Sequence, residues 1–401
     1  MLRKRRTRLS ALVGTALVLG LLAAAQPAGA VGETPSTVVG VGSDAMYRMG
    51  QALADLYNGS PGCNIIQSPQ TNFLYQCQAD TADTITTENY THDEVYSSYP
   101  LGGGSGVKQL VNQGSASYRH ADYALQTSAP TATSAAGLKY VAYARDALTW
   151  EAFPGLKGAP AAKLHNVGGA CAGTTGYCLT QGQLQNIFIN CTWTNWNQLP
   201  GVTINHAISI YTATLGAGTR TQWDAFLGGD SSQCIPAGDK ATHQPPETSN
   251  PVIIAAGQAK WAISLASFGG WNGKVKPYPD KSRLGAVDGV APSNASLIDG
   301  SFPFGRYVFN VYCTGTLGDG TCANGAGPSS AAAVRYVGET DGWICKRLTA
   351  HATEPYSKLN YRSLIEKTIT AQGFVPLPGG PTGGGAVGSS FCRLFSKDFL
   401  P

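Results

Sequence analysis

Three glycine-rich turns, each followed by a segment of helical character, constrain the fold of this chain most strongly. They are residues 40–44 (GVGSD), 102–106 (GGGSG) and 216–220 (GAGTR). The first follows a β-branched run over 37–41, so a strand, a glycine turn and a helix succeed one another. A helix amino terminus presents N–H groups without partners inside the helix, and glycine lets a ligand approach them. One such turn would more often only end a strand, because 50 of the 401 residues are glycine. The three together predict an α/β fold with a shared anion pocket.

Apolar periodicity extends this alternation of strands and helices along the chain. It predicts helices at 46–57, 107–111, 181–189, 223–227 and 361–372, and strands at 37–41, 140–144, 204–211, 261–268 and 307–312. Segments rich in Pro, Gly, Ser and Thr predict loops at 127–137, 228–251, 314–330 and 376–390. The length exceeds what a single hydrophobic core usually holds, so two domains are expected.

Residues 1–30 have the pattern of a secretory signal peptide. Five basic residues precede an apolar run over 11–25, and small residues follow at 28–30. General secretion is the favoured export route, and Arg5-Arg6 leaves the twin-arginine route open. No later segment supplies about 18 uninterrupted apolar residues, so the mature chain is expected to lack a transmembrane segment. We therefore expect a secreted or extracellular protein, with association at the cell surface left open.

The net charge of the mature chain argues against a partner that is bound through a large charged surface. The leader carries five of the 28 basic residues and none of the 24 acidic ones, which leaves 23 basic against 24 acidic residues. A net charge close to zero gives no reason to expect nucleic acid or an anionic membrane as partner. Any anion site must therefore be built locally.

Ten cysteines follow the leader, and an even number in an exported chain predicts disulfides. They are Cys63, Cys77, Cys171, Cys178, Cys191, Cys234, Cys313, Cys322, Cys345 and Cys392. Nearest-neighbour pairing would join 63 to 77, 171 to 178, 191 to 234, 313 to 322 and 345 to 392, although spacing alone does not fix the connectivity. The close Cys-x2-Cys pairs of a zinc site are absent, so neither a metal nor another cofactor is expected.

The order and spacing of several motifs carry a family resemblance. The segments are 39–44 (VGVGSD), 104–110 (GSGVKQL), 122–124 (DYA), 128–130 (SAP), 179–187, 194–197 (TNWN) and 216–222 (GAGTRTQ). Together they resemble the phosphate-binding proteins of bacterial ABC transporters, and more closely a glycine-rich, secreted actinobacterial branch of these substrate-binding proteins. The resemblance covers most of the mature chain and rests on the order of the motifs.

The resemblance implies a type II periplasmic-binding-protein fold, with two α/β lobes joined by two crossing strands and a ligand between them. Lobe one would comprise residues 31–143 plus 305–401, and lobe two residues 144–304. The strands at 140–144 and 307–312 would be the crossings, with hinge closure as the working motion. Such a protein would be a monomer without enzymatic activity that captures a small oxyanion, phosphate first, and an ABC permease is the partner it implies.

The same resemblance assigns site residues. The first turn would contribute Ser43, Asp44 and Ala45, the second Ser105 and Gly106, and the third Gly218 and Thr219. Ser128 falls where the family carries an aspartate that accepts the proton of hydrogen phosphate. The arginine that normally precedes the third turn is also missing, since Ala213 and Leu215 occupy that approach.

Two residues could compensate for these replacements. Arg220 could supply a bidentate guanidinium, and Asp44 could accept a hydrogen bond from a ligand hydroxyl. The alternative for Arg220 is a solvated helix residue. The alternative for Asp44 is a helix N-cap that bonds the N–H of Met46 or Tyr47.

Two other classes of function compete with solute capture. Ser105 and Lys108 fit a Ser-x-x-Lys pattern, but the Ser-Asp-Asn and Lys-Thr-Gly partners of penicillin-recognising hydrolases do not follow. The six histidines are scattered, and no Gly-x-Ser-x-Gly or His-Glu-x-x-His occurs. Seven tryptophans permit a sugar-binding or adhesion module on the same fold, although core packing explains Trp150, Trp193, Trp196, Trp261 and Trp271 better.

Overall fold

The computed structural model describes the larger part of the chain after the predicted leader. The described residues are 37–59, 64–67, 74–76, 94–100, 103–112, 121–165, 168–174, 176–245, 259–273, 282–314, 322, 329, 331–338, 342–345, 361–377 and 392–395. The predicted signal peptide and the predicted pair of Cys63 and Cys77 lie outside these residues. Within the described part, no helix combines the length and the apolar character that crossing a membrane requires.

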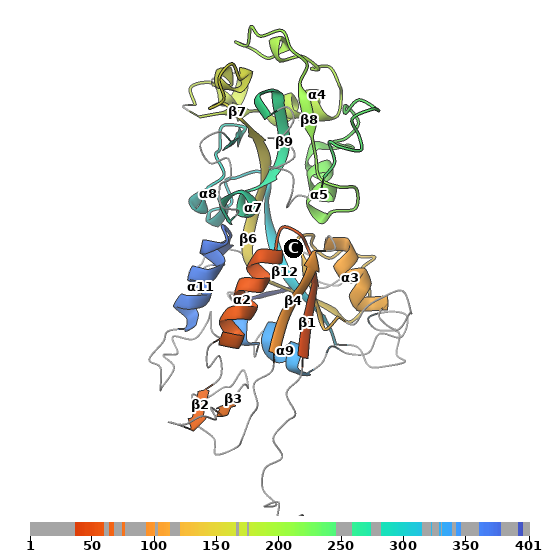
Figure 1. The fold of residues 1–401 in the computed structure, drawn as a ribbon, viewed down its shortest axis with the longest axis vertical. Helices are drawn as coiled ribbons and strands as arrows, with labels where there is room; N and C mark the ends of the chain where they lie inside the picture. Colours follow the sequence, from red (N-terminus) through yellow and green to blue (C-terminus); the bar gives the residue numbers. More distant parts are fainter. Residues whose placement is uncertain are drawn as a thin grey trace, which may run out of the picture.

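A sheet of ten strands runs through the whole molecule (Figure 1). Its main path is ordered β4-β1-β5-β12-β6-β9-β8. These strands are β1 (Thr37–Gly42), β4 (Glu94–Pro100), β5 (Tyr123–Gln126), β6 (Leu138–Ala152), β8 (Ser209–Tyr211), β9 (Ala262–Ser267) and β12 (Gly305–Cys313). The short strands β10 (Arg283–Leu284), β13 (Val375–Pro376) and β14 (Arg393–Phe395) pair with β6. Strand β1 is parallel to both β4 and β5, so the carboxyl ends of these three strands share one edge.

Strands β6 and β12 connect the two halves of the molecule. They pair antiparallel over their lengths, from Gly305 opposite Ala147 to Cys313 opposite Leu138. Beyond this ladder β6 continues into the other half, where it pairs with β9. These two strands are the expected crossings, and both are longer than the sequence predicted because their apolar character continues into each half.

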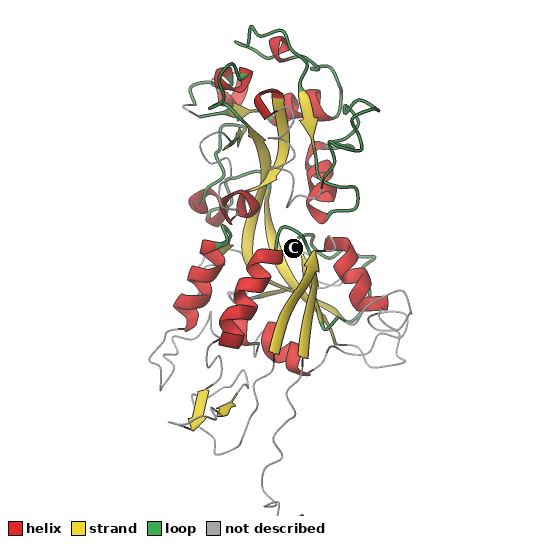
Figure 2. Ribbon diagram, viewed as in Figure 1, coloured by secondary structure: helices red, strands yellow, loops and turns green. Residues whose placement is uncertain are grey.

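Helices cover the sheet in both halves (Figure 2). The first half contains α2 (Tyr47–Gly59), α3 (Gly103–Asn112), α9 (Ala331–Val337) and α11 (Tyr361–Ala371). The second half contains α4 (Gln181–Phe188), α5 (Gly218–Leu227), α7 (Phe268–Gly273) and α8 (Asn294–Ile298), with the 3-10 turns η1 (Pro160–Lys163), η2 (Gly169–Cys171), η3 (Trp196–Gln198) and η4 (Ala259–Trp261). Two small sheets complete the described part, β7 (Cys178–Leu179) with β11 (Ala286–Val287) and β2 (Asn64–Gln67) with β3 (Leu74–Gln76).

Buried side chains form two large hydrophobic clusters, one in each half. The first includes Met49, Leu53, Tyr123 and Phe309, and the second includes Leu184, Trp196 and Trp223. Along β6 the first cluster ends at Ala144 and the second begins at Ala147. The expected two-lobed α/β fold with crossing strands is thus confirmed. We propose that the clusters are the cores of the lobes delimited above, with Val375 as a residue of the carboxyl-terminal part that packs into the second core.

Most predicted elements are present with shifted ends. The largest differences are β6, which ends at Ala152 rather than at residue 144, α5 and α3, which begin at Gly218 and Gly103 rather than at 223 and 107, and β8, which covers only 209–211 of the predicted 204–211. Residues 206–208 of the missing part pair instead with residues 194–196 in an isolated antiparallel bridge, because Trp196 N–H donates to the His206 carbonyl and Ile208 N–H to the Thr194 carbonyl, each at 2.9 Å. Four predicted disulfides are confirmed: Cys171–Cys178, Cys191–Cys234, Cys313–Cys322 and Cys345–Cys392.

Candidate functional site

The first glycine turn joins β1 to α2 at the shared carboxyl edge. Ser43 is buried, and its N–H donates to the Leu125 carbonyl of β5 at 2.9 Å. Asp44 and Ala45 follow it and are half-buried. The N–H groups of Met46 and Tyr47 donate to the backbone carbonyls of Ser43 and Asp44, at 3.1 and 3.4 Å. Backbone carbonyls therefore occupy the two N–H groups that the capping alternative assigned to the Asp44 side chain.

The second glycine turn lies directly against the first. Because α3 starts at Gly103, residues 103–106, including Ser105 and Gly106, form its first turn, whose N–H groups have no partners inside the helix. Gly106 is buried, and a Cβ added to it would stand 2.5 Å from the Gly42 Cα. Only glycine allows this approach, so the structure brings the first two predicted turns together.

The third glycine turn comes from the other half and meets the loop after β5. Helix α5 begins at Gly218, and its N-cap residue, Ala217, provides no side-chain hydrogen bond. A Cβ added to Gly218 would lie 2.9 Å from Thr127 Oγ1 and 3.5 Å from Ser128 Oγ. The Gln222 side chain of α5 donates from Nε2 to the Thr127 carbonyl at 2.6 Å. Ser128 and the third turn are therefore in contact across the two halves.

Arg306, at the start of β12, is a buried cation that the sequence reasoning missed. It pairs with Asp146 of β6 through Nε at 2.9 Å and Nη2 at 2.6 Å, and the two side chains are 2% and 0% exposed. Nη1 also donates to Gln222 Oε1 at 2.9 Å. Nη1 and Nη2 each lie 3.4 Å from the hydroxyl oxygen of Thr219, which is long for a hydrogen bond. The end of this guanidinium thus points at the first turn of α5 with two weakly engaged N–H groups.

A sequence signal for this pair existed. Asp146 and Arg306 each lie within two residues of a predicted lobe boundary and beside the predicted crossing strands 140–144 and 307–312. A charged residue that becomes buried there is almost always paired, because burying a lone charge is costly.

Arg220 has a different environment from the one expected of a ligand residue. It is 1% exposed, and protein groups accept from all five of its N–H donors. Asp224 accepts from Nε, the Ala213 carbonyl and Gln244 Oε1 accept from Nη1, and Asp230 and Ser232 accept from Nη2. This arrangement matches neither a ligand residue that replaces the missing arginine nor a solvated helix residue. Instead, Arg220 holds the loop after α5 in place through its hydrogen bonds to Asp230 and Ser232.

The environment of Asp230, one of the acceptors of Arg220, changes its pKa. Partial burial raises the pKa of Asp230, but hydrogen bonds from Ser232 and Arg220, together with the charge of Arg220, outweigh that effect and lower the pKa below its usual value. The lowered pKa means that this contribution to stability is present above the unfolded-state pKa of an aspartate and is lost as the pH falls through the folded-state pKa.

We therefore expect the variant Arg220→Ala to lose stability rather than affinity. Removing one partner of a buried ion pair costs about 3–5 kcal/mol, and the cost here should lie at the lower end because Asp230 is 56% exposed. The midpoint of urea denaturation should fall, while the oxyanion affinity of the folded protein stays within a factor of about two, which is about 0.4 kcal/mol. Calorimetric titration well below the unfolding transition checks this, and a large loss of affinity there would restore Arg220 as a ligand residue.

Four tryptophans make contacts within the protein that leave little free ring surface for stacking on a sugar. Trp150 and Trp196 are fully buried. The ring of Trp261 is stacked on His206 at 3.8 Å, and Lys260 lies 4.6 Å from its centroid. Trp271 donates its ring N–H to Ser282 at 3.1 Å. These contacts favour the packing interpretation over a sugar-stacking platform for these four residues.

Comparisons with known proteins give fold-level similarity only. No family model matches the chain, and a search of curated proteins found no match. Among solved structures, an ABC-type phosphate transport receptor from Vibrio cholerae is 14% identical, with a TM-score of 0.47, over 84% of this chain and 99% of the receptor. A phosphate-binding protein from Stenotrophomonas maltophilia is also 14% identical, with a TM-score of 0.46, over 86% of this chain and 91% of that protein. At this identity the similarity does not identify a ligand for this chain.

Proposed function

We propose that this chain is an extracellular solute-binding protein that captures a small oxyanion, with inorganic phosphate as the first candidate, between its two lobes for ABC-type uptake. One observation carries the proposal: the turn from β1 to α2 meets the first turn of α3 at Gly42 and Gly106, while the first turn of α5 meets Ser128 from the opposite lobe. Helix amino termini from both sides would thus surround one small volume. Their N–H groups and the positive ends of their dipoles suit a multiply charged tetrahedral anion.

Arg306 completes the proposed site in place of the arginine missing before the third turn. Its end-on pair of N–H groups, directed at Thr219, has the geometry to donate to two oxygens of one anion. Asp146 already balances its charge, so the buried pair is neutral and the anion would be held mainly by hydrogen bonds. Ser43, Asp44, Ala45, Ser105, Gly106, Ser128, Gly218 and Thr219 remain the proposed ligand residues. In this proposal binding is reversible and no covalent bond of the ligand changes.

The test is a thermal-shift panel of phosphate, sulfate, nucleotides and sugars on the exported chain. Phosphate should raise the melting temperature, because a ligand at 100 times its Kd stabilises the folded state by about 2.7 kcal/mol. A shift with sulfate alone would keep the oxyanion class and replace phosphate. A shift only with a sugar or a nucleotide would favour a secreted binding or adhesion module on the same fold, and hydrolysis lost on substitution of Ser105 would favour an enzyme.

A further inference from the structure

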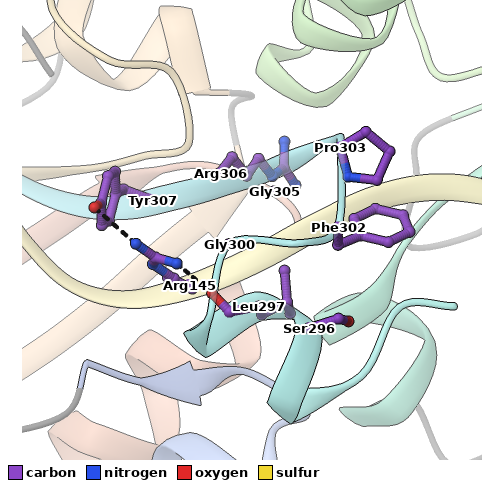
Figure 3. Close-up of a pocket in the computed structure, with 9 residues that line it drawn as sticks. All are labelled: Arg145, Ser296, Leu297, Gly300, Phe302, Pro303, Gly305, Arg306 and Tyr307. Carbon is purple, nitrogen blue, oxygen red and sulfur yellow. Dashed lines mark hydrogen bonds between the residues drawn. The ribbon is translucent and has the colours of Figure 1, made fainter. Parts of the chain in front are cut away.

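A cavity lies beside the crossing strands, and its lining includes Arg306, whose side chain points away from Arg145 (Figure 3). It measures about 240 Å³, and its walls include Arg145 of β6, Tyr307 of β12 and Phe302, with Gly300 and Gly305 at its exposed rim. Arg145 and Tyr307 stand directly opposite each other in the β6–β12 ladder, one position along from Asp146 and Arg306. Successive side chains of a strand point to opposite faces, so the two pairs face opposite sides of the sheet.

Two guanidinium groups converge at the phenol of Tyr307. Its oxygen accepts from Arg145 Nη2 at 3.0 Å and from Arg393 Nη1 at 2.9 Å. The guanidinium carbons lie 4.9 and 5.8 Å from the centre of the ring. A carboxylate already interacts with one of these guanidinium groups: hydrogen bonds from Ser301 and the charge of Arg145 lower the pKa of Asp299.

Arg145 keeps donors available on its cavity side. Its Nη1 donates to the carbonyls of Leu297 and Ile298 at the end of α8. Among the residues that the structure describes, no carboxylate lies within ion-pairing distance of Arg145, and no group accepts from its Nε. The Nε–H together with the second hydrogen of Nη2 forms the side of a guanidinium that binds the two oxygens of a carboxylate.

We propose that this cavity binds a small organic carboxylate, held by Arg145 and oriented against the ring of Tyr307. At about 30 Å³ for each water-sized group, the cavity has room for a ligand of roughly eight non-hydrogen atoms. A planar carboxylate matches the guanidinium side in two parallel hydrogen bonds, and Phe302 supplies an apolar wall for a short carbon chain. We propose it as a site separate from the oxyanion site, because the side chains of Arg145 and Tyr307 lie on the opposite face of the crossing strands from the side chain of Arg306.

The experiment titrates the whole exported chain with malonate by calorimetry, with and without an excess of inorganic phosphate. We expect one saturable malonate site whose affinity phosphate leaves unchanged. The variant Arg145→Gln should weaken malonate binding at least tenfold, and Tyr307→Phe should weaken it several-fold because it removes the oxygen that positions both guanidinium groups. The control Arg48→Gln removes an exposed arginine of α2 and should bind malonate like the unmodified chain.

Three results would overturn the proposal: no saturable malonate binding, displacement of malonate by phosphate, or unchanged affinity in Arg145→Gln. If Arg145→Gln fails to fold, unchanged affinity in Tyr307→Phe overturns it in the same way, since that change removes a single oxygen. Phosphate binding is measured separately on each variant. A chain that binds malonate but not phosphate would refute the proposed function alone, and the reverse would refute the carboxylate site alone.

Discussion

The variant Arg306→Met should lose oxyanion binding, with Kd rising about 100-fold or more. The expected cause is the loss of the two N–H groups that point at Thr219, since a hydrogen bond to a charged group contributes about 1.5–3 kcal/mol and 100-fold corresponds to about 2.7 kcal/mol. Calorimetric titration with phosphate measures the change. Arg306→Lys should bind with intermediate affinity, because it keeps the charge and loses the planar fork.

The same variant should also be unstable, which calls for a matched control. Without Arg306, the carboxylate of Asp146 would be left fully buried, with the Gly269 N–H as its one partner among the described residues, a change that costs about 3–5 kcal/mol. In the double variant Arg306→Met/Asp146→Asn the buried charge is gone and the amide oxygen can still accept from Gly269. Stability should then recover while binding stays lost. A double variant that binds phosphate like the unmodified chain would show that Arg306 acts only in the fold.

The alternation of elements could be predicted from the sequence because it is a local property. The β-branched run before Gly40 and the apolar face from Met49 to Tyr57 predict a strand and a helix without any tertiary information. The predicted strand over 204–211 was too long because contacts with a distant segment, rather than the local pattern, decide its structure. Hydrogen bonds with Thr194 and Trp196 occupy the backbone of Ile208 and His206, and no local pattern shows this competition.

The candidate site shows the same division between local and long-range information. Contact between Gly42 and Gly106 could be expected once both turns were placed at the carboxyl edge of parallel strands. Arg306 could not be located in this way, because its position opposite Asp146 depends on the register of two strands about 160 residues apart in sequence. For Arg220, the Asp224 four residues later is a local signal of an ion pair, although the two alternatives weighed for Arg220 were a ligand residue and a solvated helix residue.

The variant Gly106→Ala should separate the first two turns and impair both stability and binding. The added Cβ would stand 2.5 Å from the Gly42 Cα and 2.9 Å from the Val41 carbonyl oxygen, and backbone atoms have little freedom to move away. Overpacking of this kind costs about 1–3 kcal/mol, and we expect the oxyanion affinity to fall at least tenfold because the N–H groups of α2 and α3 no longer face one volume.

A matched control for this change exists in α4. Gly182 is also a helical glycine, and a Cβ added to it would meet nothing within 4 Å. Gly182→Ala should therefore stabilise the protein, by up to about 1 kcal/mol, because alanine loses less backbone entropy than glycine in a helix, and it should leave binding unchanged. Urea denaturation and phosphate titration of the two variants side by side measure both effects. Equal behaviour of the two alanine variants would mean that the contact between the first two turns does not shape the site, and the convergence of helix amino termini would then no longer support oxyanion capture.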